Sequence, residues 1–458
     1  MLNYNSENAQ SSISKFEHML KTNHIYFFDG QEFEDIILHY LGFGDNQLAK
    51  KALKMGLEQH PSNAELMLLQ SEIFILDEKF DNAIDLLNYI EKLVTLDEEI
   101  ALQRATIASK TGNHKASIEF LHIALGSTEE PQEIWNLLGM EHLLAEEYED
   151  AEYFFKNCLS DNPEDYPSLY NLLYCYEQLK KDDEAIASLN DILEIDPYCE
   201  VAWLQLGKLF NKLEKTEEAL SAFEFAIISD DTFTAAYIEK GKILEHSGNT
   251  NEAIENYEIA LNTSEPNAFV FQSIARCHEK LGNDRLAEKF FLKSVQSEPT
   301  NEKSWESLIN YHVQLKNYKK AKHYLKNALE VNSDSFLLWI QSARIYKAQN
   351  QNEKALTSYE KSLDLGYFKH SFLLDYIDLC LYMEKWSEAY QIAKTAYKGY
   401  PESEGLKLRL AGCSLIMGKL EEAKYHFYST ETQMQKIDLI HQLFSKADPS
   451  IFNKIFSK

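Results

Sequence analysis

Pairs of adjacent acidic residues recur along the chain and are the first candidates for chemistry. They include Asp183-Glu184, Glu217-Glu218 and Glu421-Glu422. Two neighbouring carboxylates could serve as the general acid and general base of a hydrolytic reaction. Each pair, however, falls in the first turn of a predicted helix, where negative charge complements the helix macrodipole. We therefore interpret these pairs as structural residues.

No other pattern of catalytic or metal-binding residues stands out in the sequence. It contains no Gly-rich phosphate loop, no Gly-x-Ser-x-Gly turn and no His-Glu-x-x-His pair. Histidines such as His142, His278 and His312 lack partners at ligand spacing. The 6 cysteines include no Cys-x-x-Cys pair, which disfavours a disulfide framework or a zinc site and indicates a reducing compartment. The sequence predicts no catalytic residue, no cofactor and no metal.

Alanines recur at a spacing of about 34 residues through most of the chain. The twelve positions are Ala49, Ala83, Ala116, Ala151, Ala185, Ala219, Ala253, Ala287, Ala321, Ala355, Ala389 and Ala423. The spacing is regular except on the two sides of Ala116, where it is 33 and 35. A large apolar residue usually stands sixteen positions before the alanine, as Trp203 does before Ala219, and another four positions after it, as Phe223 does.

These spacings predict two short amphipathic helices per repeat, because they place the apolar residues on one helical face. The alanine methyl would let the paired helices approach closely. Isolated helices of this length are marginal in water, so neighbouring repeats must stack to share one core. Turn signals such as Gly44-Asp45, Gly248-Asn249, Gly282-Asn283 and Gly418 separate the expected helices.

The repeat resembles the tetratricopeptide repeat. Its clearest copy reads Trp203-x-x-Leu206-Gly207-x-x-Phe210, followed by Ala219, Phe223 and Ala226. The resemblance covers about residues 30–437, in about twelve repeats. It implies an all-α fold, a right-handed superhelical solenoid of helix-turn-helix repeats. Ser71 and Arg104 stand where the family prefers Gly or Ala, which leaves the register of residues 64–131 open.

We expect three regions along the chain. A capping helix and loop would occupy residues 1–29, and capping helices would occupy residues 438–458, because a solenoid must cover its end repeats. The repeats between them would start near residues 30, 64, 97, 132, 166, 200, 234, 268, 302, 336, 370 and 404.

Charge and hydropathy restrict the partners. The formal net charge of -28 disfavours nucleic acid and anionic lipid, since both attract Lys and Arg. No apolar run approaches the roughly 20 residues of a membrane helix, and residues 1–16 lack the features of a secretory signal. The sequence predicts a soluble, cytoplasmic protein without a nucleic-acid or membrane partner.

In the tetratricopeptide family the first helix of each repeat lines the concave face, where ligands usually bind. The resemblance implies two groove-facing positions per repeat. One of them carries a cation or an amide in five successive repeats, as Lys208, Lys242, Arg276, Asn310 and Arg344. The other groove candidates are aromatic, apolar or amide side chains, namely Tyr170, Tyr174, Leu204, Ile238, Gln272 and Ile340.

This basic row predicts an extended, acidic and partly apolar ligand. With helices about 10 Å apart and an extended chain rising about 3.3 Å per residue, five rungs would span about a dozen ligand residues. The alternative is a solvated face whose cations offset acids such as Glu239 and Glu306. The family's carboxylate clamp for acidic chaperone tails is not supported, because Leu204, Ile238 and Ile340 stand where it needs lysine.

The favoured function is a non-enzymatic scaffold or adaptor that binds a peptide or protein segment in the concave groove. The alternative is a structural subunit that self-associates, or packs into a larger complex, through its outer surface or its ends. RNA binding through the basic row is a third and weaker interpretation. The sequence leaves the partner's identity and the oligomeric state open, since one scaffold of this kind can have many roles.

Overall fold

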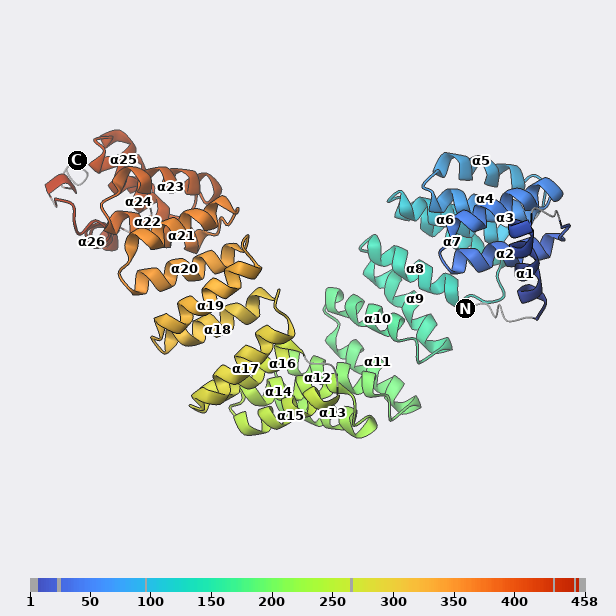
Figure 1. Cartoon of the computed structure of the whole chain (residues 1–458), viewed down its shortest axis with the longest axis horizontal. Coiled ribbons are helices and arrows are strands. Elements are labelled where there is room, and N and C mark those ends of the chain that lie inside the picture. The colour runs from blue at the N-terminus through green and yellow to red at the C-terminus, as the bar shows by residue number, and fades with distance from the viewer. Residues whose placement is uncertain are drawn as a thin grey trace. The chain divides into compact units, whose positions relative to one another are not determined.

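A computed structural model describes residues 7–22, 26–94, 97–263, 267–430, 433–448 and 450–452. In these ranges the chain forms 26 α-helices and no β-strand (Figure 1). No helix in this part of the chain is both long enough and apolar enough to cross a bilayer.

The helices alternate between first and second helices of successive pairs. The first helices are α2 (Gly30–Gly42), α4 (Ala64–Leu76), α6 (Asp97–Lys110), α8 (Gln132–Leu144), α10 (Tyr166–Leu179), α12 (Glu200–Lys212), α14 (Thr234–His246), α16 (Ala268–Lys280), α18 (Glu302–Gln314), α20 (Phe336–Ala348), α22 (His370–Tyr382) and α24 (Glu404–Ile416). The second helices are α3 (Asn46–Gln59), α5 (Phe80–Ile90), α7 (His114–Ser127), α9 (Tyr148–Asp161), α11 (Asp182–Ile195), α13 (Thr216–Ser229), α15 (Thr250–Thr263), α17 (Asp284–Ser297), α19 (Tyr318–Val331), α21 (Asn352–Asp364), α23 (Trp386–Gly399) and α25 (Leu420–Tyr428). Helix α1 (Glu7–Thr22) precedes the pairs, and α26 (Gln433–Leu443) follows them.

The pairs are grouped in two compact bodies. The N-terminal body comprises Met1–Leu209 and the C-terminal body comprises Phe210–Lys458, so the boundary lies within α12. In both bodies a first helix packs against its own second helix, and that second helix packs against the next first helix, as in the series α14, α15, α16 and α17. This is the all-α arrangement of stacked helix pairs that the sequence predicts.

The turn within each pair has a constant backbone geometry. Left-handed residues follow the first helices at intervals of 34 residues: Gly44, Glu78, Gly112, Glu146, Lys180, Glu214, Gly248, Gly282, Lys316, Asn350, Glu384 and Gly418. A residue in the left-handed conformation after a helix lets the backbone N–H groups that follow donate hydrogen bonds to the last carbonyl groups of that helix. The second helix then begins within a few residues, in several pairs with an Asp or Asn side chain that accepts a backbone N–H, as Asp45 does from Leu48.

Small residues at the contact between paired helices hold the core together. Ala219, Ala226 and Ala253 are fully buried. Gly241 of α14 faces the buried ring of Tyr257 so closely that a Cβ atom there would lie 2.7 Å from the ring. The small residues at this contact therefore let an aromatic side chain of the second helix pack directly on the backbone of the first helix.

One repeat has a different register from the one that the alanine spacing suggests. Ser117, which is 1% exposed, occupies the buried position in α7, whereas Ala116 is only half-buried. The Ser117 hydroxyl donates a hydrogen bond to the Ala105 carbonyl at 3.0 Å. Ala105, not Arg104, is the small buried residue of α6. The interpretation of Ala116 as the packing alanine is wrong, because adjacent helical residues point about 100° apart.

Helix α26 covers the final repeats of the C-terminal body on the side of their first helices. It packs against α22 and α24. Ile440 and Phe444 are buried in the same core cluster as Leu410 and Phe427, and the Phe444 ring lies over Gly412. The apolar side chains of the last pairs are thereby removed from water.

Candidate functional site

Several first helices contact the next first helix directly. These contacts join α2 with α4, α4 with α6, α16 with α18, α18 with α20, and α22 with α24. Among the described residues no pair of second helices makes a comparable contact. The first helices therefore lie closer together than the second helices, which places them on the inner side of the local curvature. We call this side the first-helix face.

Four members of the predicted basic row lie on the first-helix face of the C-terminal body. Lys242, Arg276, Asn310 and Arg344 occupy equivalent positions on α14, α16, α18 and α20. Arg344 is exposed, and the other three are half-buried. Lys208 is exposed but belongs to the N-terminal body. The structure thus brings together four of the five.

Three of the six predicted companions of the basic row are buried. Leu204, Gln272 and Ile340 are buried, and Gln272 donates a hydrogen bond to the Ser304 hydroxyl at 2.9 Å. The expectation that these three side chains face a ligand is wrong, because they are buried among the packed helices. Ile238 is half-buried beside the core.

Tyr170 and Tyr174 are both exposed on α10, in the N-terminal body. The Tyr174 ring lies edge-on to Tyr148, with ring centroids 6.3 Å apart. These two tyrosines remain accessible but belong to a different body from four of the basic residues.

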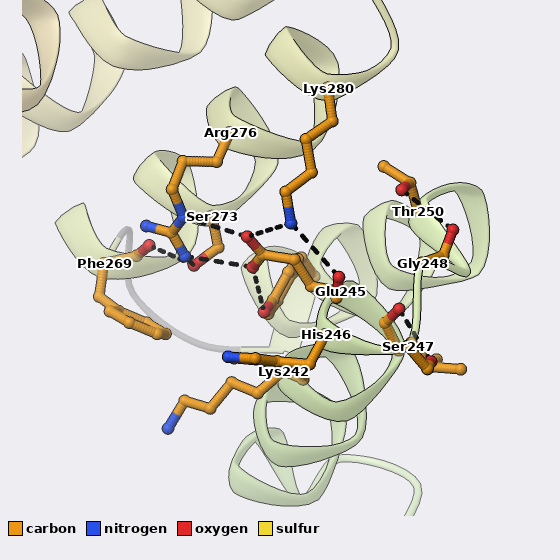
Figure 2. A network of polar contacts seen from close by, with 12 residues as sticks. Lys242, Glu245, His246, Ser247, Gly248, Thr250, Phe269, Ser273, Arg276 and Lys280 are labelled. Carbon is orange, nitrogen blue, oxygen red and sulfur yellow. Dashed lines mark hydrogen bonds and ion pairs between the residues drawn. The ribbon is translucent and has the colours of Figure 1, made fainter. Parts of the chain in front are cut away.

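Arg276 is engaged by a buried carboxylate that the sequence pattern did not reveal. Glu245 of α14, which is 6% exposed, accepts hydrogen bonds from Arg276 Nε and Nη2, both at 3.1 Å (Figure 2). Lys280 Nζ lies 3.4 Å from the same carboxylate, and the Tyr257 hydroxyl donates to it at 3.2 Å. Arg276 Nη2 also donates to the Ser273 hydroxyl. We call these five residues the Glu245 cluster.

The Glu245 cluster joins two repeats. Burial acts to raise the pKa of Glu245, but the hydrogen bonds and charges of Arg276 and Lys280 outweigh it and lower that pKa. Glu245 is therefore ionised at neutral pH. Two cations share one carboxylate, so the cluster keeps a net positive charge. Arg276 Nη1 makes no hydrogen bond within the described residues, and Lys280 is half exposed.

Lys242 lies next to this cluster. Its ammonium group is 2.8 Å from Glu239 and 5.1 Å from the centre of the Phe269 ring, which is itself exposed. Figure 2 shows Lys242 and Phe269 on the same side of the cluster. A hollow of about 580 Å³ lies beside Lys242 and is also lined by Glu239 and His246. The first-helix face therefore offers cations, an aromatic ring and an open depression within a short distance.

The histidines and acidic pairs have structural partners. The His142 ring stacks on Phe154, and its Nδ1 atom lies 2.8 Å from Glu147. His278 stacks on Phe290. The acidic pairs at 183–184, 217–218 and 421–422 lie in the first turns of α11, α13 and α25, as the structural interpretation predicts.

Acidification below about pH 6.5 is expected to destabilise the C-terminal body through its buried histidines. Burial lowers the pKa of His312, whose ring stacks on Tyr324 and lies 3.5 Å from Glu288, and it also lowers the pKa of His278. Between the ordinary value and the lower folded value, the unfolded chain binds protons that the folded chain does not. Stability must therefore fall as the pH decreases through this window.

The variant His312→Phe keeps a ring against Tyr324 and is expected to lose less stability on acidification. The measurement compares urea-unfolding midpoints at about pH 7.5 and about pH 5.5, a range in which histidine titrates. His246→Phe, at an exposed histidine, is the control. Its urea-unfolding midpoint should fall on acidification by as much as that of the wild type. An equal fall in both variants would show that His312 does not contribute.

Comparisons with known proteins support the repeat assignment. Models of the tetratricopeptide repeat match residues 35–95, 142–209, 234–266, 310–335 and 337–365. No curated protein sequence matches the chain significantly.

Several solved structures are similar to this chain. Yeast Tom70 shares 16% sequence identity over 99% of this chain and 96% of its own, with a TM-score of 0.42. A chain of the APC/C hetero-tetramer Cut9-Hcn1 shares 14% identity over 89% of this chain and 93% of its own, with a TM-score of 0.36. PilF of Pseudomonas aeruginosa shares 21% identity over 45% of this chain and 95% of its own, with a TM-score of 0.35.

Proposed function

Because the chain is a tetratricopeptide repeat protein, and this fold is generally a protein-interaction scaffold, we propose that it works as an adaptor whose first-helix face binds an extended segment of a partner protein. The binding segment would lie along α14, α16, α18 and α20 of the C-terminal body. No catalytic role is part of this proposal.

The observation that carries the proposal is the charge of this face. Lys242, Arg276 and Lys280 make ion pairs with two carboxylates, Glu239 and Glu245. Glu279 also lies within electrostatic range of Arg276, and Glu214 lines the hollow beside Lys242. Arg344 adds an exposed cation two helices further on, with no carboxylate partner among the described residues. In a protein of net charge -28 such a row of cations attracts acidic segments.

The partner segment is proposed to be acidic and partly apolar. Its carboxylates would approach Lys242, Lys280 and Arg344, and an apolar side chain would cover the exposed Phe269 ring. With helices about 10 Å apart, an extended segment meets one first helix about every third residue.

A double charge reversal, Lys242→Glu with Arg344→Glu, is expected to reduce capture of the partner by about tenfold or more, because two attractive contacts become repulsive. It leaves the Arg276–Glu245 pair intact, unlike a reversal at Arg276. The measurement is quantitative mass spectrometry of proteins captured from the native cell, with circular dichroism as the check on folding.

The matched control is Lys361→Glu with Lys398→Glu, which makes the same charge change at exposed lysines of the second helices α21 and α23. A partner should be retained by the wild type and this control and lost from the first variant. If the first variant captures the same proteins as the wild type, binding must use the outer surface or the ends instead.

A further inference from the structure

A second groove lies on the outer side of the C-terminal body, between the second helices α19 and α21. Helix α20 forms its floor, and its volume is about 500 Å³. Trp339 and Tyr346 of α20 line it, whereas Arg344 lies on the opposite side of the same helix, because residues point about 100° apart along a helix. This outer groove is therefore separate from the first-helix face.

The floor of the outer groove is apolar and aromatic. Leu325 and Leu329 of α19 stand beside the half-buried rings of Trp339 and Tyr346. The Trp339 indole N–H already donates to the Ser333 carbonyl at 3.1 Å, which fixes the ring and leaves its surface toward the groove. Rigid aromatic side chains of this kind dominate the energetics of protein contacts.

The rim of the outer groove is basic. The segment from 316 to 329 contains no acidic residue and five lysines, Lys316, Lys319, Lys320, Lys322 and Lys326, of which only Lys322 and Lys326 line the groove. Lys322 and Lys326 line the groove from α19, and Lys354 lines it from α21. Glu330 also lines the groove, and its carboxylate lies 3.6 Å from Lys326 Nζ. Lys322 and Lys354 have no carboxylate partner among the described residues.

In two similar grooves among the described residues, every lysine has a carboxylate partner. In the groove at α3 and α4, Lys50 and Lys79 both contact Asp77, at 2.6 and 3.0 Å, and Lys54 lies 4.0 Å from Glu58. In the groove at α9 and α11, the one lysine, Lys156, contacts Glu152 at 2.6 Å, and Asp191 adds negative charge. The outer groove at α20 differs from both because two of its three lysines, Lys322 and Lys354, have no carboxylate partner among the described residues.

We propose that the outer groove binds an acidic peptide segment that carries one bulky apolar side chain. The apolar side chain packs on Trp339 and Tyr346, and carboxylates on either side of it contact Lys322 and Lys354. Charge complementarity selects this occupant, since the groove combines unpaired cations with an aromatic floor. The site would let the protein hold a second segment at the same time as a segment on the first-helix face.

A synthetic peptide tests the proposal on the full-length protein. The probe is acetyl-Glu-Asp-Phe-Glu-Asp-amide, which contains no tryptophan. It should change the tryptophan fluorescence of the wild type, and Trp339→Phe should abolish that change. Lys322→Glu with Lys354→Glu should weaken binding about tenfold or more, as read from the same signal. The control, Lys319→Glu with Lys398→Glu, changes exposed lysines that do not line the groove and should bind as the wild type does.

The two proposed binding sites can be tested independently of each other. Lys242→Glu with Arg344→Glu should leave the Trp339 signal unchanged, because those residues lie on the first-helix face. The proposal is overturned if the peptide gives no fluorescence change, if the change persists in Trp339→Phe, or if the control weakens binding as much as the groove variant. It is also overturned if a peptide with Ala in place of Phe binds equally well. Concentration-dependent sedimentation that Lys322→Glu with Lys354→Glu abolishes would instead assign the groove to a second copy of this chain.

Discussion

Replacing Arg276 by methionine is expected to lower the free energy of unfolding of the C-terminal body by about 1–3 kcal/mol, less than for a fully buried ion pair, because the Arg276 side chain is 39% exposed. The reason is that Glu245, 6% exposed, would lose the guanidinium that donates two hydrogen bonds to it. Lys280 and Tyr257 remain in contact with the carboxylate and keep the loss from being larger.

A second substitution tests this cause. Adding Glu245→Gln to Arg276→Met removes the uncompensated charge and should restore most of the lost stability. Urea unfolding, together with hydrogen–deuterium exchange of α14 and α16, measures the effect globally and locally. If Arg276→Met is as stable as the wild type, or if Glu245→Gln gives no recovery, the Glu245 cluster does not join these two repeats as described.

Ala253→Leu is expected to destabilise the C-terminal body by about 1–3 kcal/mol through overpacking. Ala253 is 0% exposed on α15, one turn before Tyr257, whose ring lies against the backbone of Gly241. A branched side chain at this position has no space unless α14 and α15 move apart. Protection of the α14 and α15 amides against hydrogen exchange should fall first, since stability in a repeat protein is local.

Ala116→Leu is the matched control, because Ala116 is the half-buried alanine of α7 that precedes the true packing residue. It is expected to change stability by less than about 0.5 kcal/mol, as surface substitutions usually do. Ser117→Leu, one position further on, should behave like Ala253→Leu. Equal effects of Ala116→Leu and Ser117→Leu would contradict the register of α7.

The repeat and its helices could be predicted because packing imposes a periodic constraint on residue size. The sequence of residues 97–131 is compatible with two helix registers. Ala116 stands directly before Ser117, and either residue is small enough for the buried position. Gly112-Asn113 gives the correct register, because it corresponds to Gly248-Asn249 in the pattern of left-handed turns. Turn residues were therefore a better guide here than the most frequent residue type.

The candidate site was predictable only in part. The position of Lys242 and Arg276 on one face follows from the period, but the pairing of Arg276 with Glu245 depends on how α16 stacks on α14. The burial of Gln272 and Ile340 likewise depends on contacts with residues of neighbouring repeats. The lysines of residues 316–326 indicate the outer groove in the sequence, because a run of positive charge is unusual in this acidic chain.

Site-specific photo-crosslinking in the native cell tests the adaptor role of the first-helix face most directly. A photoreactive side chain at His246, which is exposed and lines the hollow beside Lys242, should crosslink to an acidic segment of one partner protein. The same group at Lys361, on second helix α21, should not crosslink to that segment. The account would be contradicted if His246 gave no protein crosslink, or if the partner were recovered from Lys361 alone.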